Sequence, residues 1–305
     1  MKKQIEIEIE IQYKPSRRRD LLAATRLIFE TYNHLRTQTG KQPMVRSLRK
    51  ASPLGVHLWS VNPELSFCAW HGKKLVGYTQ ALIRSKQWYL AYLFVHPQYQ
   101  DKKVGKGLLE RIWREAPGMS HGLATFAYNP QAIGTYSQFG MTIREALPCM
   151  VARPEQLQKP ARTGLKADSK LTARDLEWIH ALESRIRGYS HPQEWHFWLK
   201  QPNWRGTIYR DGSKRVGYCL GTLDGYFAPV GAISNQYLVR ILKEHIAGLQ
   251  LKKKQTARTF CPSNNLAAYQ LLLKCGFRVR ELIVFMSDKR YGDFQRYIPA
   301  DLAVF

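Results

Sequence analysis

The sequence predicts an α/β protein built from two related domains. Three observations carry this prediction: the length, an alternation of strand-like and helix-like segments, and an internal repeat. The 305 residues correspond to two domains at roughly 150 residues each. With 44% hydrophobic and 12% aromatic residues, the chain has enough apolar surface for two packed cores.

The internal repeat consists of two markers in the same order. Residues 70–78 (WHGKKLVGY) recur as residues 210–218 (RDGSKRVGY), and each copy is typical of a strand, a glycine-containing tight turn and a second strand. The pattern Asn-x-x-Ala followed by Gly-Met at 129–141 recurs with Gly-Phe at 265–277. The second pair lies at a slightly smaller spacing, so we expect the second copy to be shorter between the markers.

The domain boundary is expected in a linker at residues 153–170. There Pro154, Pro160, Gly164 and several charges interrupt any apolar period. We therefore predict a first domain at residues 1–152 and a second at residues 171–305.

Apolar periodicity predicts alternating elements in both domains. The opening residues alternate charge with isoleucine and indicate a strand. The first domain is expected to contain a strand at 4–12, a helix at 19–36, a loop-rich helical stretch around 43–60, strands at 65–70, 74–84 and 88–95, a helix at 104–115, a strand at 121–127, a helix at 130–139 and a strand at 142–152. The second is expected to contain helices at 173–186 and 193–200, strands at 205–210 and 215–223, a helix at 234–247, a strand at 256–261, a helix at 265–274 and a strand at 277–287.

Composition excludes several classes of protein. A charged fraction of 23%, a mean hydropathy of -0.39 and the lack of an apolar run of about 18 residues argue against a membrane protein. The N-terminus lacks the apolar core of a secretion signal, so we expect a cytoplasmic protein. The five cysteines include no C-x-x-C pair and the nine histidines no H-E-x-x-H. We therefore expect buried reduced thiols and no metal.

The net charge is unusual. Lysine and arginine number 47 against 23 acidic residues, which leaves +24. Such an excess favours an anionic partner but does not identify it. Arg17–Arg19 and Lys252–Lys254 are the visible basic clusters, and no nucleic-acid recognition motif accompanies them.

The segment from Leu93 to Leu109 is the most informative. An apolar strand ends at Pro97, a polar loop follows, and Gly105 and Gly107 begin an amphipathic helix. The first turn of a helix leaves backbone N–H groups without partners, its dipole favours anions, and glycine allows close approach. The sequence therefore predicts a phosphate cradle, with added charge from three lysines: Lys102, Lys103 and Lys106.

This segment resembles the GNAT superfamily of acyl-CoA-dependent N-acetyltransferases. Members have Val-x-Pro at the strand end and then Gln/Arg-x-x-Gly-x-Gly/Ala. Val95, Gln100 and Gly105 match, whereas Lys103 occupies the place of the first glycine. A second family pattern, Asn-x-x-Ala-x-x-x-Tyr-x-x-x-Gly-Phe, is followed over residues 129–141 with Met for Phe.

The resemblance implies two tandem GNAT-like domains, each a mixed, mostly antiparallel sheet flanked by helices, and acetyl transfer from acetyl-CoA to an amine by direct attack in a ternary complex. Backbone groups at Phe94 and Val95 would hold the acyl carbonyl and pantetheine. Asn129, also expected among the cofactor-binding residues, would precede the helix that places Tyr136, the expected general acid. The pyrophosphate of coenzyme A would lie on a run of eight residues: Gln100, Asp101, Lys102, Lys103, Val104, Gly105, Lys106 and Gly107.

The general base is not identified by sequence. No carboxylate lies between Tyr89 and Val95, and Glu30 and Glu64 are the candidates, each of which could equally be a surface charge. His96 beside the cradle could contact phosphate or be a loop residue. Gly118–Gly122 matches G-x-S-x-G, but it follows a predicted helix and precedes a strand, the reverse of a nucleophile elbow.

The second domain departs from the family pattern. At the place of the pyrophosphate loop it has Phe227–Asn235, without Gln-x-x-Gly-x-Gly, and Leu272 stands where tyrosine is expected. It resembles the degenerate copy of tandem GNAT proteins, with a structural role or a role in shaping the acceptor site.

Two other function classes stay open. A non-catalytic acyl-CoA sensor or scaffold fits Lys103 and the missing base, and a nucleic-acid-binding protein fits the net charge. The acceptor would be a small-molecule or peptide amine, without a membrane partner, and the protein a monomer or a homodimer.

Overall fold

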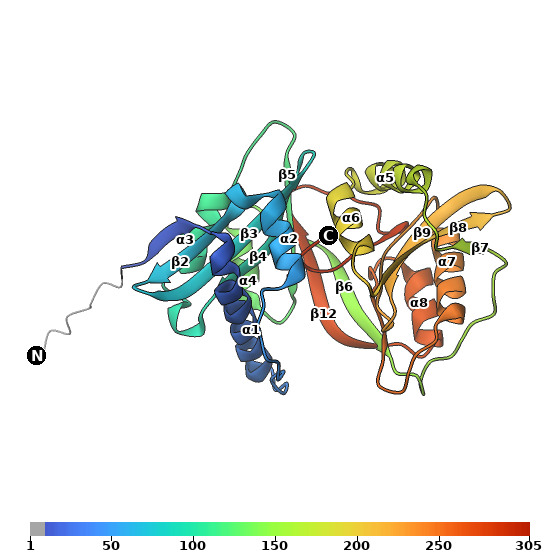
Figure 1. Cartoon of the computed structure of the whole chain (residues 1–305), viewed down its shortest axis with the longest axis horizontal. Helices are drawn as coiled ribbons and strands as arrows, with labels where there is room; N and C mark the ends of the chain where they lie inside the picture. Colours follow the sequence, from blue (N-terminus) through green and yellow to red (C-terminus); the bar gives the residue numbers. More distant parts are fainter. Residues whose placement is uncertain (1–9) are drawn as a thin grey trace, which may run out of the picture. The chain divides into compact units, whose positions relative to one another are not determined.

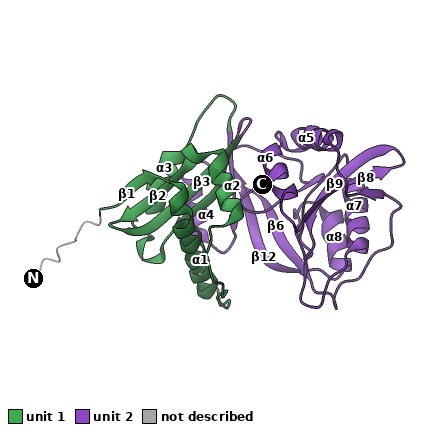
Figure 2. Cartoon of the chain, viewed as in Figure 1, with its two compact units in different colours: residues 1–83, 88–119 green, residues 84–87, 120–305 purple. Residues whose placement is uncertain are grey.

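The computed structural model describes residues 10–305, which fold into two compact units (Figures 1 and 2). Of the described residues, the first unit comprises 10–83 and 88–119, and the second comprises 84–87 and 120–305. The fold is mixed α/β, with helices flanking the sheets, as predicted.

The first unit places its strands in the order β1-β2-β3-β4. The predicted strand 4–12 lies mostly outside the described residues, and the first described strand begins at Gln12. In chain order the elements are β1 (Gln12–Pro15), the 3-10 turn η1 (Arg18–Asp20), α1 (Leu21–Gln38), α2 (Pro53–Val61), η2 (Pro63–Leu65), β2 (Ser66–His71), β3 (Lys74–Arg84), β4 (Gln87–Val95), η3 (Pro97–Tyr99) and α3 (Val104–Ile112).

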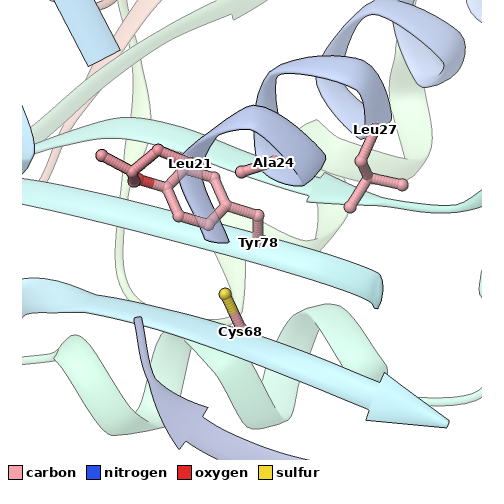
Figure 3. Packing of buried hydrophobic residues seen from close by; sticks show 5 residues of the cluster. All are labelled: Leu21, Ala24, Leu27, Cys68 and Tyr78. Carbon is pink, nitrogen blue, oxygen red and sulfur yellow. The ribbon is translucent and has the colours of Figure 1, made fainter. Parts of the chain in front are cut away.

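Helices cover both faces of this sheet. On one face, the α1 residues Leu21, Ala24 and Leu27 pack with Cys68 and Tyr78 (Figure 3). On the other face, Val104 and Leu108 of α3 pack with Ala69 and Val76. These side chains are at most 4% exposed, and burial of each large one contributes about 1.5–3 kcal/mol. The two cores fix the start of α3 relative to the end of β4.

The second unit contains two groups of paired strands, β5-β12-β6-β11 and β13-β10-β9-β8-β7. Its elements are β5 (Ser120–Phe126), α4 (Pro130–Ser137), β6 (Thr142–Ala152), β7 (Lys166–Asp168), α5 (Ala173–Arg187), α6 (Pro192–Leu199), β8 (Trp204–Asp211), β9 (Lys214–Thr222), β10 (Phe227–Ala232), α7 (Asn235–Gly248), β11 (Ala257–Phe260), α8 (Leu266–Lys274), β12 (Arg278–Ser287) and β13 (Tyr297–Ile298).

Strand β12 lies between two strands of the first repeat copy. It pairs antiparallel with β5, where Phe285 faces Ala124, and with β6, where Ile283 faces Leu147. The last strand of the second copy thus completes the late strands of the first. For this reason β5, α4 and β6 count with the second compact unit. The domain boundary at 153–170 stays a prediction from the repeat.

The repeat is visible in the backbone. In the hairpins β2–β3 and β8–β9 the turn glycines Gly72 and Gly212 have φ of 56° and 58°. Both hairpins also contain the same irregularity, where Ala69 faces Gly77 and Tyr209 faces Gly217 before the register shifts. A Cβ on Gly77 would lie 2.8 Å from Leu108 of α3. Helices α3 and α7 are equivalent, because a Cβ on Gly217 would likewise meet a side chain of α7.

The interpretation of Phe227–Asn235 as the counterpart of a loop is wrong. Residues 227–232 form β10, a fully buried strand, and α7 begins at Asn235 with almost no connection. Pro229 and Gly231 disfavour strands in sequence, whereas burial on both faces outweighs that preference here.

Residues 10–305 contain neither a membrane-spanning helix nor a group of side chains placed to bind a metal. None of the helices in that range is long and apolar enough to span a membrane. No group of three or more His, Cys, Asp or Glu side chains is placed to hold a metal ion there. All five cysteines are buried free thiols.

Candidate functional site

The end of β4 leads into the predicted phosphate loop through a tight turn. His96 is the N-cap of η3, and its Nδ1 atom accepts a hydrogen bond from the Gln98 amide at 3.3 Å. The His96 amide donates to the Val76 carbonyl of β3 at 2.9 Å. The loop therefore leaves the sheet at a fixed point, directly after Val95.

Gln100 fastens the loop to the strand end. Its Nε2 atom donates to the Val95 carbonyl at 3.1 Å, and the Thr31 hydroxyl of α1 lies 3.5 Å from the same oxygen. The resemblance places Gln100 among the pyrophosphate-binding residues, and its side chain also shapes the loop. Sequence reasoning missed Thr31, because helical periodicity gives no sign of a contact to a distant strand.

The loop then enters α3 through two left-handed residues. Asp101 and Lys103 have φ of 61° and 60°, in the region that favours glycine. Lys103 is the N-cap residue of α3 and makes no side-chain cap. Lys103, at the position that the resemblance gives to the first family glycine, thus has a backbone conformation that favours glycine.

The first turn of α3 presents backbone amides at its N-terminus. The Gly107 amide donates to the Lys103 carbonyl at 3.0 Å. Val104, Gly105 and Lys106 precede this bond, so their amides point along the helix axis toward the loop. Partial positive charge from these groups and from the helix dipole favours an anion at this point. The structure thus fits the phosphate cradle predicted from sequence.

The two glycines of α3 differ in their surroundings. A Cβ on Gly105 would touch Val95 at 3.5 Å, an ordinary contact, whereas a Cβ on Gly107 would lie 2.5 Å from the Tyr13 hydroxyl. Arg111 stacks on the same tyrosine at 3.8 Å. Gly107 is therefore required by the packing of β1 against α3.

Basic side chains gather around Tyr99 beside the loop. Lys102 and Lys74 lie 5.3 and 5.7 Å from its ring centre, and its hydroxyl bonds to His71 at 2.8 Å. Lys106 points elsewhere and pairs with Glu110 at 3.9 Å. Tyr99 was not predicted as a site residue, and it holds two cations beside the loop.

One of the two base candidates, Glu30, pairs with His96. The His96 Nε2 atom lies 3.2 Å from a Glu30 carboxylate oxygen. Because His96 Nδ1 accepts from an amide, the neutral ring carries its proton on Nε2 and donates it to Glu30. Glu30 is 60% exposed and His96 only 8% in their side chains, so the carboxylate is accessible while the imidazole orients it. Glu64 instead accepts from its neighbour Asn62.

Tyr136 and Asn129 belong to the second unit. Asn129 is the N-cap of α4, and its side chain accepts from the Ala132 amide at 3.2 Å. Tyr136 is 6% exposed, and burial raises its pKa. A phenol with a raised pKa stays protonated at neutral pH, as a general acid must. The Asn-x-x-Ala pattern is thus a helix cap, and Asn265 of the second copy caps α8 in the same way.

A second basic region lies at the start of η1. A hollow of about 600 Å³ is lined by Arg17 and Arg19 together with Lys14, Lys73 and Trp70. Asp20 also lines it and accepts from the Arg17 amide. The predicted cluster Arg17–Arg19 is therefore joined by two lysines that sequence alone did not connect with it.

A family model matches part of the first half of the chain. Residues 27–141 match the model of the acetyltransferase (GNAT) family. No curated protein matches the sequence. Among solved structures, a presumed acetyltransferase from Pyrococcus horikoshii superimposes with a TM-score of 0.75 at 14% identity, over 97% of this chain and 96% of the other.

Two further structures extend this similarity. A GCN5-related N-acetyltransferase from Sphaerobacter thermophilus gives a TM-score of 0.62 at 18% identity, over 97% and 98% of the two chains. A tandem GNAT protein from the clavulanic acid biosynthesis pathway gives a TM-score of 0.56 at 14% identity, over 91% of this chain and 98% of the other. At these identities the matches establish a shared fold. Residues 27–141 therefore match a GNAT acetyltransferase domain model, and the chain as a whole shares its fold with tandem GNAT proteins.

Proposed function

We propose that this protein is an acetyl-CoA-dependent N-acetyltransferase that acts on a primary amine by direct attack in a ternary complex. The observation that carries the proposal is the entrance to α3, where Lys103 has a left-handed backbone conformation at the position that the resemblance gives to the first family glycine. Three first-turn amides and the lysines beside Tyr99 surround this entrance. These groups suit the pyrophosphate of coenzyme A.

The strand end supplies the groups for the acyl chain. Successive residues of a strand direct their backbone groups to opposite edges. Since the His96 amide bonds to β3, the Val95 amide faces the other edge, where it can donate to a carbonyl of the acyl-pantetheine chain. A donor fixed in this way stabilises negative charge that develops on the thioester oxygen.

The proton transfers are assigned to two groups. Glu30, oriented by His96, takes a proton from the amine nitrogen, so that the neutral amine attacks and the product is a neutral amide. The amine nitrogen forms the new C–N bond, the C–S bond breaks, and Tyr136 is assigned by its motif to donate a proton to the departing thiolate. The Tyr136 phenol carries its proton at neutral pH, and because burial raises its pKa it is a weaker acid than an exposed tyrosine.

A negative charge introduced at the start of α3 tests whether this site binds acetyl-CoA. Gly105→Asp places a carboxylate among the first-turn amides without a steric clash, and an acidic residue there suits the helix dipole. We expect normal folding and at least tenfold weaker acetyl-CoA binding by calorimetry, whereas Gly105→Ala should bind nearly as the unchanged protein. Equal affinity of the two variants would exclude the cradle.

Turnover separates the enzyme from the alternative, an acyl-CoA sensor or scaffold. A panel of small-molecule and peptide amines is assayed for release of free coenzyme A. An enzyme releases thiol in proportion to one class of amine, while a sensor binds acetyl-CoA and releases none above slow hydrolysis. Glu30→Gln should reduce turnover at neutral pH, and Glu64→Gln should not.

A further inference from the structure

The two copies can be aligned residue by residue at the strand end. In the first copy the His96 amide donates to Val76 at 2.9 Å, and in the second the Ile233 amide donates to Val216 at 3.0 Å. Val76 and Val216 precede the equivalent glycines Gly77 and Gly217. Ala232 is therefore the counterpart of Val95, the residue whose amide we assign to the acyl chain.

In the second copy this amide already has a partner. The Ala232 amide donates to the Arg296 carbonyl at 3.0 Å. The next residues, Tyr297 and Ile298, form β13 and pair with Gly231 and Val230 of β10. A segment of the chain itself therefore lies along the edge of β10 that corresponds to the acyl-chain edge of β4.

The same segment is tied to the starts of both flanking helices. At α7, the Asn235 side chain donates to the Gln295 carbonyl at 2.8 Å. At α8, the Asn265 side chain donates to the carbonyls of Phe294 and Gln295, both at 3.1 Å. Helices α7 and α8 are the counterparts of α3 and α4. Phe294, Tyr297 and Ile298 are at most 7% exposed, so the segment is an integral part of this copy.

The entrance to α7 has also lost the features of the cradle. In the first copy α3 begins nine positions after the last residue of β4. In the second copy the connection is much shorter, because β10 ends at Ala232 and α7 begins at Asn235. The Ser234 hydroxyl accepts from the Tyr237 amide at 3.3 Å. A side chain thus satisfies an amide of the first turn, the kind of group that the first copy presents to an anion.

We propose that residues 293–298 occupy, in the second copy, the place that acyl-CoA takes in the first. The second copy is then a closed acyl-CoA site with the chain's own backbone as a permanent ligand. A peptide suits this place because it carries amide and carbonyl groups along an extended chain, as pantetheine does. The proposal rests on the proposed function for the identity of the ligand in the first copy, and it implies one acetyl-CoA per chain.

Amide hydrogen exchange resolved by NMR tests the proposal. We expect the Ala232 amide to be protected in the free protein and unchanged when acetyl-CoA is added, and the Val95 amide to gain protection on addition. Fast exchange at Ala232, or a gain of protection there with acetyl-CoA, would overturn the proposal. A lack of response at Val95 would count against the proposed function alone, because protection of Ala232 is measured without ligand.

A double variant loosens the segment without touching the first copy. Asn235→Ala with Gln295→Ala removes side-chain bonds between α7 and the segment, and Gln295 is exposed. We expect exchange at Ala232 to accelerate about tenfold, as the loss of one or two hydrogen bonds implies, with acetyl transfer unchanged.

The matched control is Gln255→Ala, which removes a glutamine bond to the Leu223 carbonyl elsewhere in the same unit. It should leave exchange at Ala232 unchanged. Equal exchange at Ala232 in the double variant and in this control would show that the segment is not held as proposed.

Discussion

Lys103 combines a lysine side chain with a backbone conformation that favours glycine. For an L-residue this conformation costs about 1 kcal/mol, and here it shapes the entrance to α3. Lys103→Gly should remove this cost. The resulting gain in stability is partly offset, because glycine has greater conformational freedom in the unfolded chain. We expect the free energy of unfolding in urea to rise by up to about 1 kcal/mol.

Lys102→Ala is the charge-matched control for that variant. It removes one positive charge from the same loop without relieving a left-handed residue, so it should not stabilise the protein. If both variants have the same free energy of unfolding, the conformation of Lys103 carries no cost.

Tyr136 is the second residue whose environment predicts a measurable effect. Burial raises its pKa, so the phenol stays protonated beyond the usual tyrosine range of about 10. Tyr136→Phe should lower kcat by about 10²-fold or more, since general acid catalysis contributes about that much, and leave the Kd for acetyl-CoA nearly unchanged. Tyr128→Phe is the control, and full activity of Tyr136→Phe would remove the assigned role.

The residue scale also shows how far the site could be predicted. The loop 100–107 and its helix follow from glycine and lysine spacing, because the first turn of a helix has the same orphan amides in every protein. The Glu30–His96 pair could not be predicted, since it joins α1 to the end of β4 across a long stretch of sequence. The packing role of Gly107 depends on Tyr13, from a strand at the other end of the unit's sequence.

At the scale of elements, α5 carries a buried acidic group. Glu183 is fully buried and accepts from His191, Trp195 and Tyr218. Burial alone raises the pKa of this carboxyl, but the contacts with His191 and the Arg187 charge outweigh it and lower the pKa to about 2. Burial also lowers the pKa of His191.

Both groups make the fold sensitive to acid. An unfolded glutamate binds a proton near pH 4.3 and an unfolded histidine near pH 6.5, so the unfolded state takes up protons first as the pH falls. We expect the free energy of unfolding to decrease from pH 6.5 toward pH 2.

Glu183→Gln should be less acid-sensitive and about 3 kcal/mol less stable at pH 7, because it removes the buried negative charge that offsets the buried charge of Arg187. The exposed Glu177→Gln on the same helix is the control. A pH profile of Glu183→Gln that parallels the unchanged protein would contradict this role.

Strand β12 gives a second prediction at this scale. A fragment that ends at Ala152 would lack the strand between β5 and β6, and both strands would expose unpaired backbone and apolar side chains. We expect this fragment to aggregate or to lack a cooperative thermal transition by circular dichroism. Co-expression with residues 153–305 should restore folding. An independently folded fragment would show that β12 is dispensable.

Elements with a clear hydrophobic period were predicted well, whereas elements that depend on tertiary contacts were not. The helices 173–186 and 234–247 and the hairpin strands agree with α5, α7 and β8–β9 within a few residues. Strand β10 was missed because Pro229 and Gly231 disfavour strands in isolation. The pairing of β12 with β5 and β6 depends on contacts far apart in sequence, which a local pattern does not encode.

At the scale of the whole molecule, one cofactor does not account for the net charge of +24. The hollow near η1 concentrates Lys14, Arg17, Arg19 and Lys73 around Trp70. A polyanion would gain affinity there by counterion release. We expect binding of single-stranded DNA to weaken with salt, and the magnitude of the slope of log K against log salt to fall by about 2 in a variant with Gln at 17, 19 and 73.

Acetyl transfer should be unchanged in that triple variant. The control replaces Lys252–Lys254 by glutamine, which removes the same charge from a basic run that does not line the hollow. Equal slopes for the two variants would show that the hollow has no special role. A slope near zero for the unchanged protein would exclude the nucleic-acid alternative.

The insertion of β12 has a consequence for synthesis on the ribosome. Strands β5 and β6 are complete once Ala152 has been made, yet the strand between them ends at Ser287. At about 5–20 residues per second, translation leaves these two strands waiting on the order of ten seconds for their partner. The late strands of the first copy therefore fold after most of the chain has been translated, and a chaperone that shields exposed strand edges would act during that interval.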